Sequence, residues 1–217
     1  MGFFSSLVAL IDRSGRTSHL FARYWSRFVF WGVGIRPVVT GAENIPRDQA
    51  VIFAANHQST MDIPAMFGYL PAEFRIMAKR VLFLIPFLGW HLYLGGNIAI
   101  NRKDTKKAYS SVFRAASKLK QNLSLLVFAE GTRSRDGKLH RLKRGGFTLA
   151  RKLNAPVVPV AIKGTFELMP AGAWLAKPGK IEINIRPPIY PNDPKFATLE
   201  EDVRSELIAA GLAEAER

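Results

Sequence analysis

His57 and Asp62 stand five residues apart, where an apolar run ends in a polar turn within AANHQSTMDIPAMF, residues 54–67. A carboxylate that bonds one ring nitrogen of a histidine fixes the tautomer and leaves the other nitrogen as a proton acceptor. A histidine held in this way can remove a proton from a hydroxyl. The pair therefore predicts His57 as a general base and Asp62 as the group that orients it.

Helix capping is the competing interpretation of the same residues. Ser59 and Asp62 fit the capping-box pattern, but a helix that begins just after Ser59 would need the N–H that Pro64 lacks. A helix that begins near Asp62 places Pro64 harmlessly in the first turn. Asp62 as a simple N-cap thus remains the alternative to a catalytic role.

The sequence signals no protein nucleophile for such a base. Cysteine is absent, and the G-x-S-x-G pattern of serine hydrolases does not occur. A lipid hydrolase is therefore disfavoured. The hydroxyl that His57 activates is best supplied by a substrate.

Cationic residues supply a second set of functional candidates. Arg102 follows GNIAIN, and EGTRSR occupies residues 130–135. Gly131 allows close backbone approach and Thr132 offers a hydroxyl, while arginines can hold phosphate oxygens in two-pronged contacts. Lys143 precedes a Gly-Gly pair and a predicted helix, which adds positive charge at a helix start. The alternative is a solvated polar turn.

Strands that alternate with helices must position these residues. Strands are expected at 38–41, 50–56, 74–78, 97–101, 124–129, 157–162 and 180–186, and helices at 62–70, about 105–120, 146–153 and after 198. This order predicts an α/β fold with a mixed, largely parallel sheet flanked by helices. Ligands bind at the carboxyl ends of such strands, where the loops at 56–62, 79–80, 101–102 and 130–135 are expected to converge. Pro159 predicts an edge position or a bulge for its strand.

The composition predicts a polyanionic partner. Lys and Arg number 31 against 17 Asp and Glu, giving a net charge of +14. Nucleic acid is disfavoured, because the aromatic residues gather in two apolar stretches and do not interleave with a basic groove. The four histidines lack ligand-like spacing, so no metal is implied.

The two apolar stretches point to a membrane surface. Residues 1–35 mix aromatic side chains with arginines but contain no uncharged run of the roughly 20 residues that a spanning helix needs. This mixture favours a segment in the membrane interface. The residues expected among acyl chains are Phe3, Phe4, Trp25, Phe28 and Trp31, and those expected at head groups are Arg13, Arg16, Arg23 and Arg27. The alternative is a helix packed on the protein's own core. The charge-free stretch 81–101 is interrupted by Pro and Gly and predicts a greasy segment followed by a strand.

Four blocks in this order resemble the glycerolipid acyltransferase family, and most closely its 1-acyl-sn-glycerol-3-phosphate acyltransferases. The blocks are NHQSTMD, GNIAINR, FAEGTRSR and VVPVAI, and LKRGGFTLA also resembles the segment after the third. Together they span about residues 40–163. Ala129 departs from the family, in which Pro is frequent at this position.

The resemblance implies acyl transfer from a thioester, either acyl-CoA or acyl carrier protein, to the free hydroxyl of a lysophospholipid, with phosphatidic acid as the product. It assigns His57 as the base with Asp62 as its partner, and Pro159 to the acyl-donor site. It assigns acceptor binding to Arg102, Glu130, Gly131, Thr132, Arg133 and, with the basic segment before the helix, Lys143.

The resemblance also implies a division of the chain. Residues 1–35 would form a membrane-associated helical segment and residues 36–217 the acyltransferase domain, bound monotopically to the cytoplasmic face of a bacterial inner membrane. The alternatives are an acyltransferase for another lysolipid and an inactive lipid-binding protein on the same fold.

Overall fold

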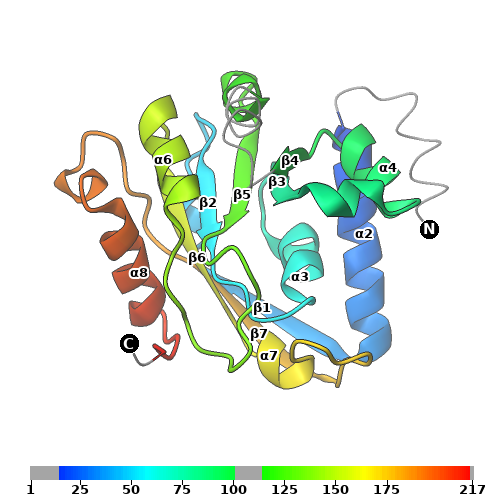
Figure 1. Ribbon diagram of the computed structural model, residues 1–217. Coiled ribbons are helices and arrows are strands. Elements are labelled where there is room, and N and C mark those ends of the chain that lie inside the picture. The colour runs from blue at the N-terminus through cyan, green and yellow to red at the C-terminus, as the bar shows by residue number, and fades with distance from the viewer. Residues whose placement is uncertain (1–14, 101–113, 216–217) are drawn as a thin grey trace.

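The computed structural model describes residues 15–100 and 114–215 and arranges them as a sheet between two layers of helices (Figure 1). The strands are β1 (Ile35–Thr40), β2 (Ile52–Ala55), β3 (Phe74–Lys79), β4 (Ile98–Ile100), β5 (Ser124–Phe128), β6 (Val157–Lys163) and β7 (Gly179–Ile185). The helices are α2 (Arg16–Val33), α3 (Asp62–Tyr69), α4 (Leu88–Leu94), α6 (Arg144–Leu153), α7 (Thr165–Leu168) and α8 (Leu199–Ala209), with 3₁₀ turns η1 (Ala42–Asn44), η2 (Arg80–Leu84) and η3 (Pro194–Phe196). Residues 114–120 are also helical.

The sheet is mixed and largely parallel, as the sequence predicts. Its strand order is β1-β7-β6-β2-β5-β3-β4, and among these pairs the β6–β7 pair is antiparallel. Five strands therefore run in one direction, and β1 and β7 run in the other. The carboxyl ends of β2, β5 and β6, which are neighbours, meet at one rim of the sheet.

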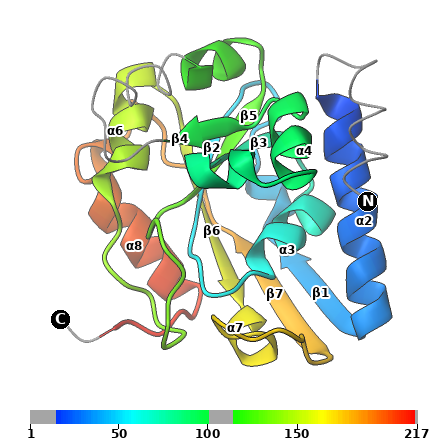
Figure 2. The same ribbon diagram turned by 45° about the vertical axis from the view of Figure 1, so that its right-hand side comes forward.

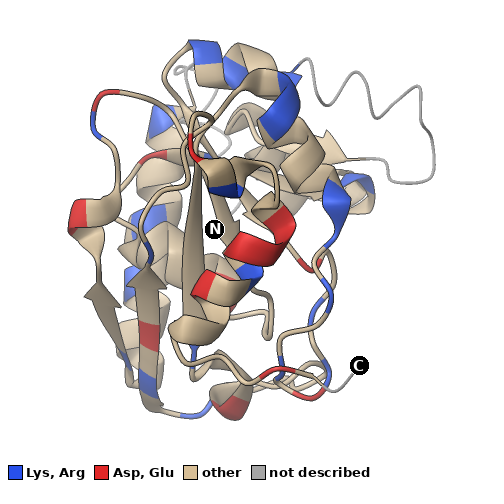
Figure 3. Ribbon diagram, turned by 90° about the vertical axis from the view of Figure 1, so that its left-hand side faces the viewer, with Lys and Arg blue, Asp and Glu red and all other residues tan. Residues whose placement is uncertain are grey.

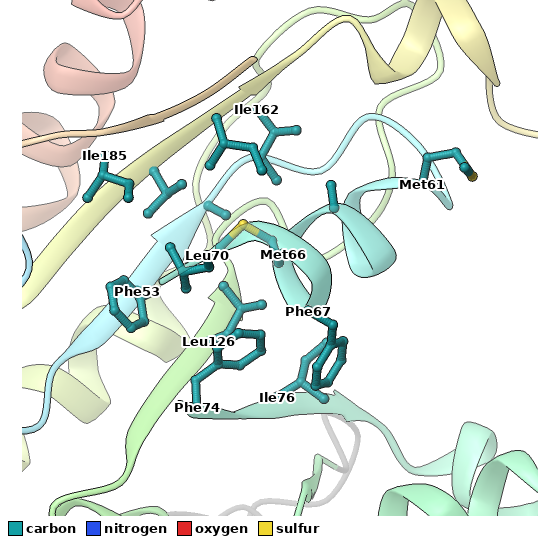
Figure 4. Packing of buried hydrophobic residues seen from close by; sticks show 14 of the residues in the cluster. Phe53, Met61, Met66, Phe67, Leu70, Phe74, Ile76, Leu126, Ile162 and Ile185 are labelled. Carbon is teal, nitrogen blue, oxygen red and sulfur yellow. The ribbon is translucent and has the colours of Figure 1, made fainter. Parts of the chain in front are cut away.

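Two hydrophobic clusters lie on opposite faces of the sheet. Successive residues of β2 alternate between them, with Phe53 in one cluster and Ile52 in the other. Figure 4 shows the first cluster, where Met66 of α3 and Leu70, just beyond its end, lie near Phe53 and Ile162. The helices α6 and α8 cover the second face. Both faces of β2 are thus buried, which explains its continuous apolar run.

Pro159 occupies the interior of the sheet, so the expected edge strand or bulge is wrong. Its strand, β6, pairs with β2 on one side and β7 on the other. The β6–β7 pairing begins only at Val160, and the Pro159 carbonyl accepts a hydrogen bond from Arg186 N at 2.9 Å, just beyond the end of β7. Pro159 thus stands at the end of the β6–β7 ladder, where its missing N–H removes only the terminal bond of the ladder.

α2 packs one face on the core and exposes an aromatic face to solvent. Phe30 is fully buried, whereas Leu20, Tyr24, Phe28 and Trp31 are 42%, 66%, 57% and 78% exposed. We call the surface formed by these four exposed residues, three of which are aromatic, the aromatic face. Its outward direction agrees with the predicted interface helix, although α2 also packs on the protein's own core. Phe3, Phe4 and Arg13 lie outside the described residues.

The arginines of α2 lie elsewhere than expected. Arg23 donates to the Leu70 carbonyl at 2.7 Å, and Arg27 donates to the Gly68 carbonyl at 2.8 Å. Both therefore bind carbonyl groups at the carboxyl end of α3, where a cation is favourable. The expectation that they sit with the aromatic residues at head groups is corrected by this packing.

The stretch 80–100 forms the short elements η2, α4 and β4 with several exposed apolar side chains, including Leu84, Trp90 and Tyr93. Within residues 15–100 and 114–215, no helix has the length and apolar character needed to cross a membrane.

Candidate active site

The His57 turn is held by the end of β2. The side chain of Asn56 donates to the Ile162 carbonyl at 2.8 Å and accepts from Ile162 N at 2.7 Å, which joins the end of β2 to β6. The His57 carbonyl accepts from Ser134 N at 2.7 Å. The His57 ring stacks on Phe128 of β5 with centroids 4.0 Å apart. The backbone and ring of His57 are thus fixed by two neighbouring strands.

His57 and Asp62 make the hydrogen bond that the spacing predicts. His57 Nδ1 and Asp62 Oδ2 lie 2.8 Å apart. When Nδ1–H donates to the carboxylate, the other ring nitrogen, Nε2, holds the lone pair. The side chain of His57 is 13% exposed and that of Asp62 is fully buried. The pair therefore consists of an accessible imidazole and a shielded carboxylate.

Asp62 does not cap its helix, so the alternative interpretation is wrong. Met61 is the N-cap residue, and Asp62 lies in the first turn of α3. Asp62 Oδ2 accepts from the backbone amides of Gln58 at 2.7 Å and Ser59 at 2.8 Å. The carboxylate is turned back onto the residues that precede it, which closes the tight turn between His57 and α3.

Thr165 is a residue of the site that the sequence analysis missed. Its buried hydroxyl donates to Asp62 Oδ1 at 2.6 Å, from the first residue of α7. With it, both carboxylate oxygens have donors, which offsets the cost of burying this group. Its position in the sequence could have indicated this role, because Gly164 and Thr165 directly follow the carboxyl end of β6, and β6 lies next to β2 in the sheet.

Glu130 is buried and binds two backbone amides, whereas the sequence analysis expected it to bind the acceptor substrate. It is 3% exposed. Oε1 accepts from His57 N at 2.8 Å, and Oε2 accepts from His140 N at 2.9 Å. Burial raises the pKa of Glu130, and the two backbone hydrogen bonds oppose that rise. The carboxylate joins the His57 turn to the loop before α6 and presents no free oxygen to a ligand.

Arg133 is the predicted cation that the structure brings to the His57 turn. Gly131 has φ of 74°, a left-handed conformation that favours glycine, and it turns the chain sharply after β5. Thr132 and Arg133 follow it and are exposed. Arg133 Nη1 donates to the hydroxyl of Thr60, three residues beyond His57. A guanidinium therefore contacts the turn that carries His57 and remains exposed to solvent.

The remaining predicted site residues are less directly connected to His57. Lys143 is exposed at the N-cap of α6, and its backbone N–H donates to Ala129 at 2.8 Å. Pro159 lies within β6 opposite Ala54, in the sheet and away from the turn. Arg102 lies outside the described residues, so its position stays a prediction.

Several amides near His57 are already engaged. Those of His57, Gln58 and Ser59 donate to the two buried carboxylates, and Gly131 N donates to the Phe128 carbonyl at 3.0 Å. Each of these amides therefore has an intramolecular acceptor. In the described part of the chain, no group of three His, Asp or Glu residues is placed to hold a metal ion.

The view of Figure 3 shows how charge is distributed over the face formed by α6 and α8. Basic and acidic residues alternate there, as in the pair formed by Arg151 and Glu200.

Comparisons with known proteins define the class. Residues 36–163, more than half of the chain, match the family model described as Acyltransferase. This chain belongs to the acyltransferase family.

Individual relatives show which members of the family this chain resembles. A chloroplastic 1-acyl-sn-glycerol-3-phosphate acyltransferase of Brassica napus is 33% identical over 84% of this chain and 54% of its own length. The 1-acyl-sn-glycerol-3-phosphate acyltransferase of Pseudomonas aeruginosa is 35% identical over 76% of this chain and 65% of its own. The chain thus spans about half of the Brassica protein and about two thirds of the Pseudomonas one.

A solved structure extends the similarity to the fold. The crystal structure of the 1-acyl-sn-glycerophosphate acyltransferase PlsC from Thermotoga maritima has a TM-score of 0.80 and 30% identity, and the match covers 96% of this chain and 87% of that one.

Proposed function

We propose that this protein transfers a fatty acyl group from a thioester to the free hydroxyl of 1-acyl-sn-glycerol 3-phosphate, giving phosphatidic acid. The observation that carries the proposal is the hydrogen bond between accessible His57 and buried Asp62, 2.8 Å long. The family of the chain and the activity named for its relatives support the same reaction.

His57 Nε2 takes the proton of the acceptor hydroxyl as the oxygen attacks the thioester carbonyl. The new C–O bond forms while the carbonyl π electrons move onto oxygen. The imidazolium that results is stabilised by the Asp62 carboxylate across the Nδ1 contact. Collapse of the tetrahedral species breaks the C–S bond, and the departing sulfur takes the proton from His57. The products are an ester and a free thiol, and His57 returns to its starting state.

Arg133 fits the role of holding the acceptor phosphate. Its contact with Thr60 places the guanidinium on the His57 turn, and a charge-assisted contact to phosphate is stronger than a neutral one. Gly131 and Thr132 support this loop and offer backbone and hydroxyl groups. The same role in acceptor binding is proposed for Lys143 and Arg102. Glu130 acts as a positioning residue for the His57 backbone.

The acyl donor is a thioester of coenzyme A or of acyl carrier protein, and both leave as a thiol. Pro159 is proposed to shape the donor site from within the sheet. The mechanism uses only the chain's own side chains and the two substrates.

The acceptor is dissolved in a bilayer, so the protein is proposed to bind the membrane monotopically. The aromatic face of α2 supports this attachment, because Tyr24, Phe28 and Trp31 leave large apolar surfaces exposed. The net charge of +14 favours an anionic surface. The proposed location is the cytoplasmic face of a bacterial inner membrane, where both thioester donors would be accessible.

The test is a panel of thioester donors and lysolipid acceptors on the purified protein, with release of free thiol as the readout. Wild type should release thiol with 1-acyl-sn-glycerol 3-phosphate as acceptor. His57→Ala should lose roughly 100- to 10,000-fold in rate. His140→Ala is the matched control, because the His140 side chain is about half exposed and pairs with Asp136, whereas its backbone N–H, which binds Glu130, is kept in alanine.

Three outcomes would contradict the proposal. Full activity of His57→Ala would remove the base assignment. Thiol release with a different lysolipid alone would indicate another acceptor. Vesicle binding without thiol release from any donor would indicate an inactive lipid-binding protein.

A further inference from the structure

Trp174 and Leu175 are the most exposed large apolar side chains in the described part of the chain. They are 95% and 85% exposed, and they are consecutive in the loop between α7 and β7. Single exposed apolar residues are ordinary, but two adjacent and almost fully exposed ones leave a large area in contact with water. We call Trp174 and Leu175 the tip of this loop. Binding of a partner that covers the tip would remove this apolar area from water.

The loop that carries this tip is held at its base. Lys177 N donates to the Leu168 carbonyl at 2.9 Å, and Ala173 N donates to Pro170 at 3.0 Å. Leu168 and Ala176 pack against the hydrophobic cluster under α3. The base is therefore part of the folded core, and the tip is displayed by a defined turn.

The two ends of the loop connect the tip to the active site and to α2. At one end, the Met169 carbonyl accepts from Ser59 Oγ, two residues after His57. At the other end, Gly179 N donates to the carbonyl of Gly34, just beyond α2, at 3.3 Å. Figures 1 and 2 both show this gold loop running along the lower edge from α7 towards the lower end of α2. The tip therefore lies between the His57 turn and the end of α2 that bears Trp31.

Basic residues border the same edge. Lys177 is exposed two residues after Leu175. Exposed Lys180 and Arg36 are register partners on neighbouring strands β7 and β1. Glu182 pairs with Lys180, and Glu167 on α7 is an exposed acid nearby. An apolar tip with lysine and arginine behind it matches the order of acyl chains and anionic head groups in a bilayer.

We propose that Trp174 and Leu175 insert into the lipid interface as a second contact beside the aromatic face of α2. The occupant is the bilayer that holds the acceptor, so the inference rests on the proposed acyl transfer to a lysophospholipid. Insertion of the tip brings the Ser59 end of the loop, and with it the His57 turn, to the membrane surface. The lysolipid hydroxyl can then reach His57 without leaving the interface.

Fluorescence tests the insertion directly, because the chain has four tryptophans. Trp25→Phe, Trp31→Phe and Trp90→Phe together leave Trp174 as the single emitter. Vesicles of phosphatidylglycerol and phosphatidylethanolamine should shift its emission to the blue, and lipids brominated on the acyl chains should quench it. If the emission wavelength of Trp174 does not change on addition of vesicles and iodide still quenches its fluorescence, the proposal is overturned. A blue shift that grows with protein concentration without vesicles would also overturn it, in favour of a second copy of this chain.

Vesicle sedimentation of the full chain supplies the energetic test. Trp174→Ser with Leu175→Ser should weaken partitioning at least about 100-fold, because two large apolar side chains lose their burial in lipid. Tyr190→Ser is the matched control, because Tyr190 is exposed beyond the opposite end of β7. Unchanged binding of the double variant would overturn the proposal.

The alternative anchor is α4, which lies at the other end of α2, where Gly15 approaches Gly95. Tyr93→Ser on α4 should change partitioning less than the double variant. A larger loss of partitioning for Tyr93→Ser than for the double variant would overturn the proposal. All binding is measured without donor or acceptor, so failure of the thiol-release assay would leave these results unaffected and would count only against the proposed reaction.

Discussion

Thr165 donates its hydroxyl to Asp62 Oδ1 at 2.6 Å across 103 positions of the chain. This bond joins the strand–turn–helix unit that carries His57 to the end of β6. The catalytic pair itself is local, but the buried carboxylate depends on a distant residue to complete its donors. That dependence leads to the first prediction.

Thr165→Val should destabilise the protein and slow the reaction. Valine preserves the shape of threonine but leaves the buried Asp62 Oδ1 without its donor, which costs about 1–3 kcal/mol. Urea unfolding and kcat measure the two effects. Thr148→Val, at an exposed position on α6, is the control. Equal stabilities of the two variants would contradict the assigned contact.

Asp62→Asn should reduce kcat without releasing His57. The amides of Gln58 and Ser59 both point at Oδ2, so the single carbonyl oxygen of asparagine belongs there. His57 Nδ1–H can still donate to it, and the loss comes from the missing charge opposite the imidazolium. We expect a smaller fall than the roughly 100- to 10,000-fold for His57→Ala. Steady-state kinetics on both variants would decide, and a wild-type rate for Asp62→Asn would refute the role of the Asp62 charge in stabilising the imidazolium.

Glu130→Gln should lower kcat with little change in the acceptor KM. One oxygen of the carboxylate becomes an NH₂ group, which cannot accept from His57 N or His140 N, so one backbone donor loses its partner. A large rise in acceptor KM with unchanged kcat would instead favour the direct acceptor contact that the sequence suggested.

The same variant should change the pH dependence of stability. Burial raises the pKa of Glu130 in the folded state, so the folded protein holds this proton more tightly than the unfolded chain. The contribution of Glu130 to stability is therefore present below the unfolded pKa and is lost as the pH rises through the folded pKa. Glu130→Gln should lack this loss. Unfolding midpoints between pH 4 and 7 would measure it, and parallel curves would contradict the shift.

Arg133→Ala should raise the acceptor KM about 10- to 100-fold, because a charge-assisted contact contributes about 1.5–3 kcal/mol. The donor KM should stay near its wild-type value, and an acceptor without phosphate should be indifferent to the change. Arg135→Ala in the same exposed loop is the control. A change confined to the donor KM would mean that Arg133 serves the other substrate. Arg102→Ala is expected to behave as Arg133→Ala does.

His19→Phe should make the protein less sensitive to acid. His19 lies on the core side of α2 between Phe67 and Phe74, and neither ring nitrogen makes a hydrogen bond. Burial, followed by the nearby charges of Arg75 and Arg23, lowers the pKa of His19 to about 4, while Glu73 opposes them.

The sign follows from that lowered pKa. The unfolded chain takes up the proton near pH 6.5, well before the folded protein, so stability falls as the pH drops from about 6.5 towards 4. The wild type should lose on the order of 3 kcal/mol over this range, and His19→Phe should not show this loss. Chemical denaturation at pH 7.5 and pH 5 measures it. A wild-type slope in His19→Phe would contradict the prediction.

The sequence by itself determined the class of fold and the contact between His57 and Asp62. Strands were recognised because β2, β5 and β7 have apolar runs or clean alternation that reflect burial on two faces or one. His57 and Asp62 could be paired because the contact is local: a strand end and a helix start five residues apart can meet only in a tight turn.

Only the tertiary structure decided the contacts between distant segments. The order of strands made Pro159 an interior residue and placed Thr165 beside Asp62. It also buried Glu130 between two backbone amides and turned Arg23 and Arg27 onto the end of α3. Local patterns show which residues form strands and helices, but not which strand lies beside which. The partners of long-range polar groups follow from that order, because a buried donor or acceptor must be satisfied by whichever segment the sheet brings next to it.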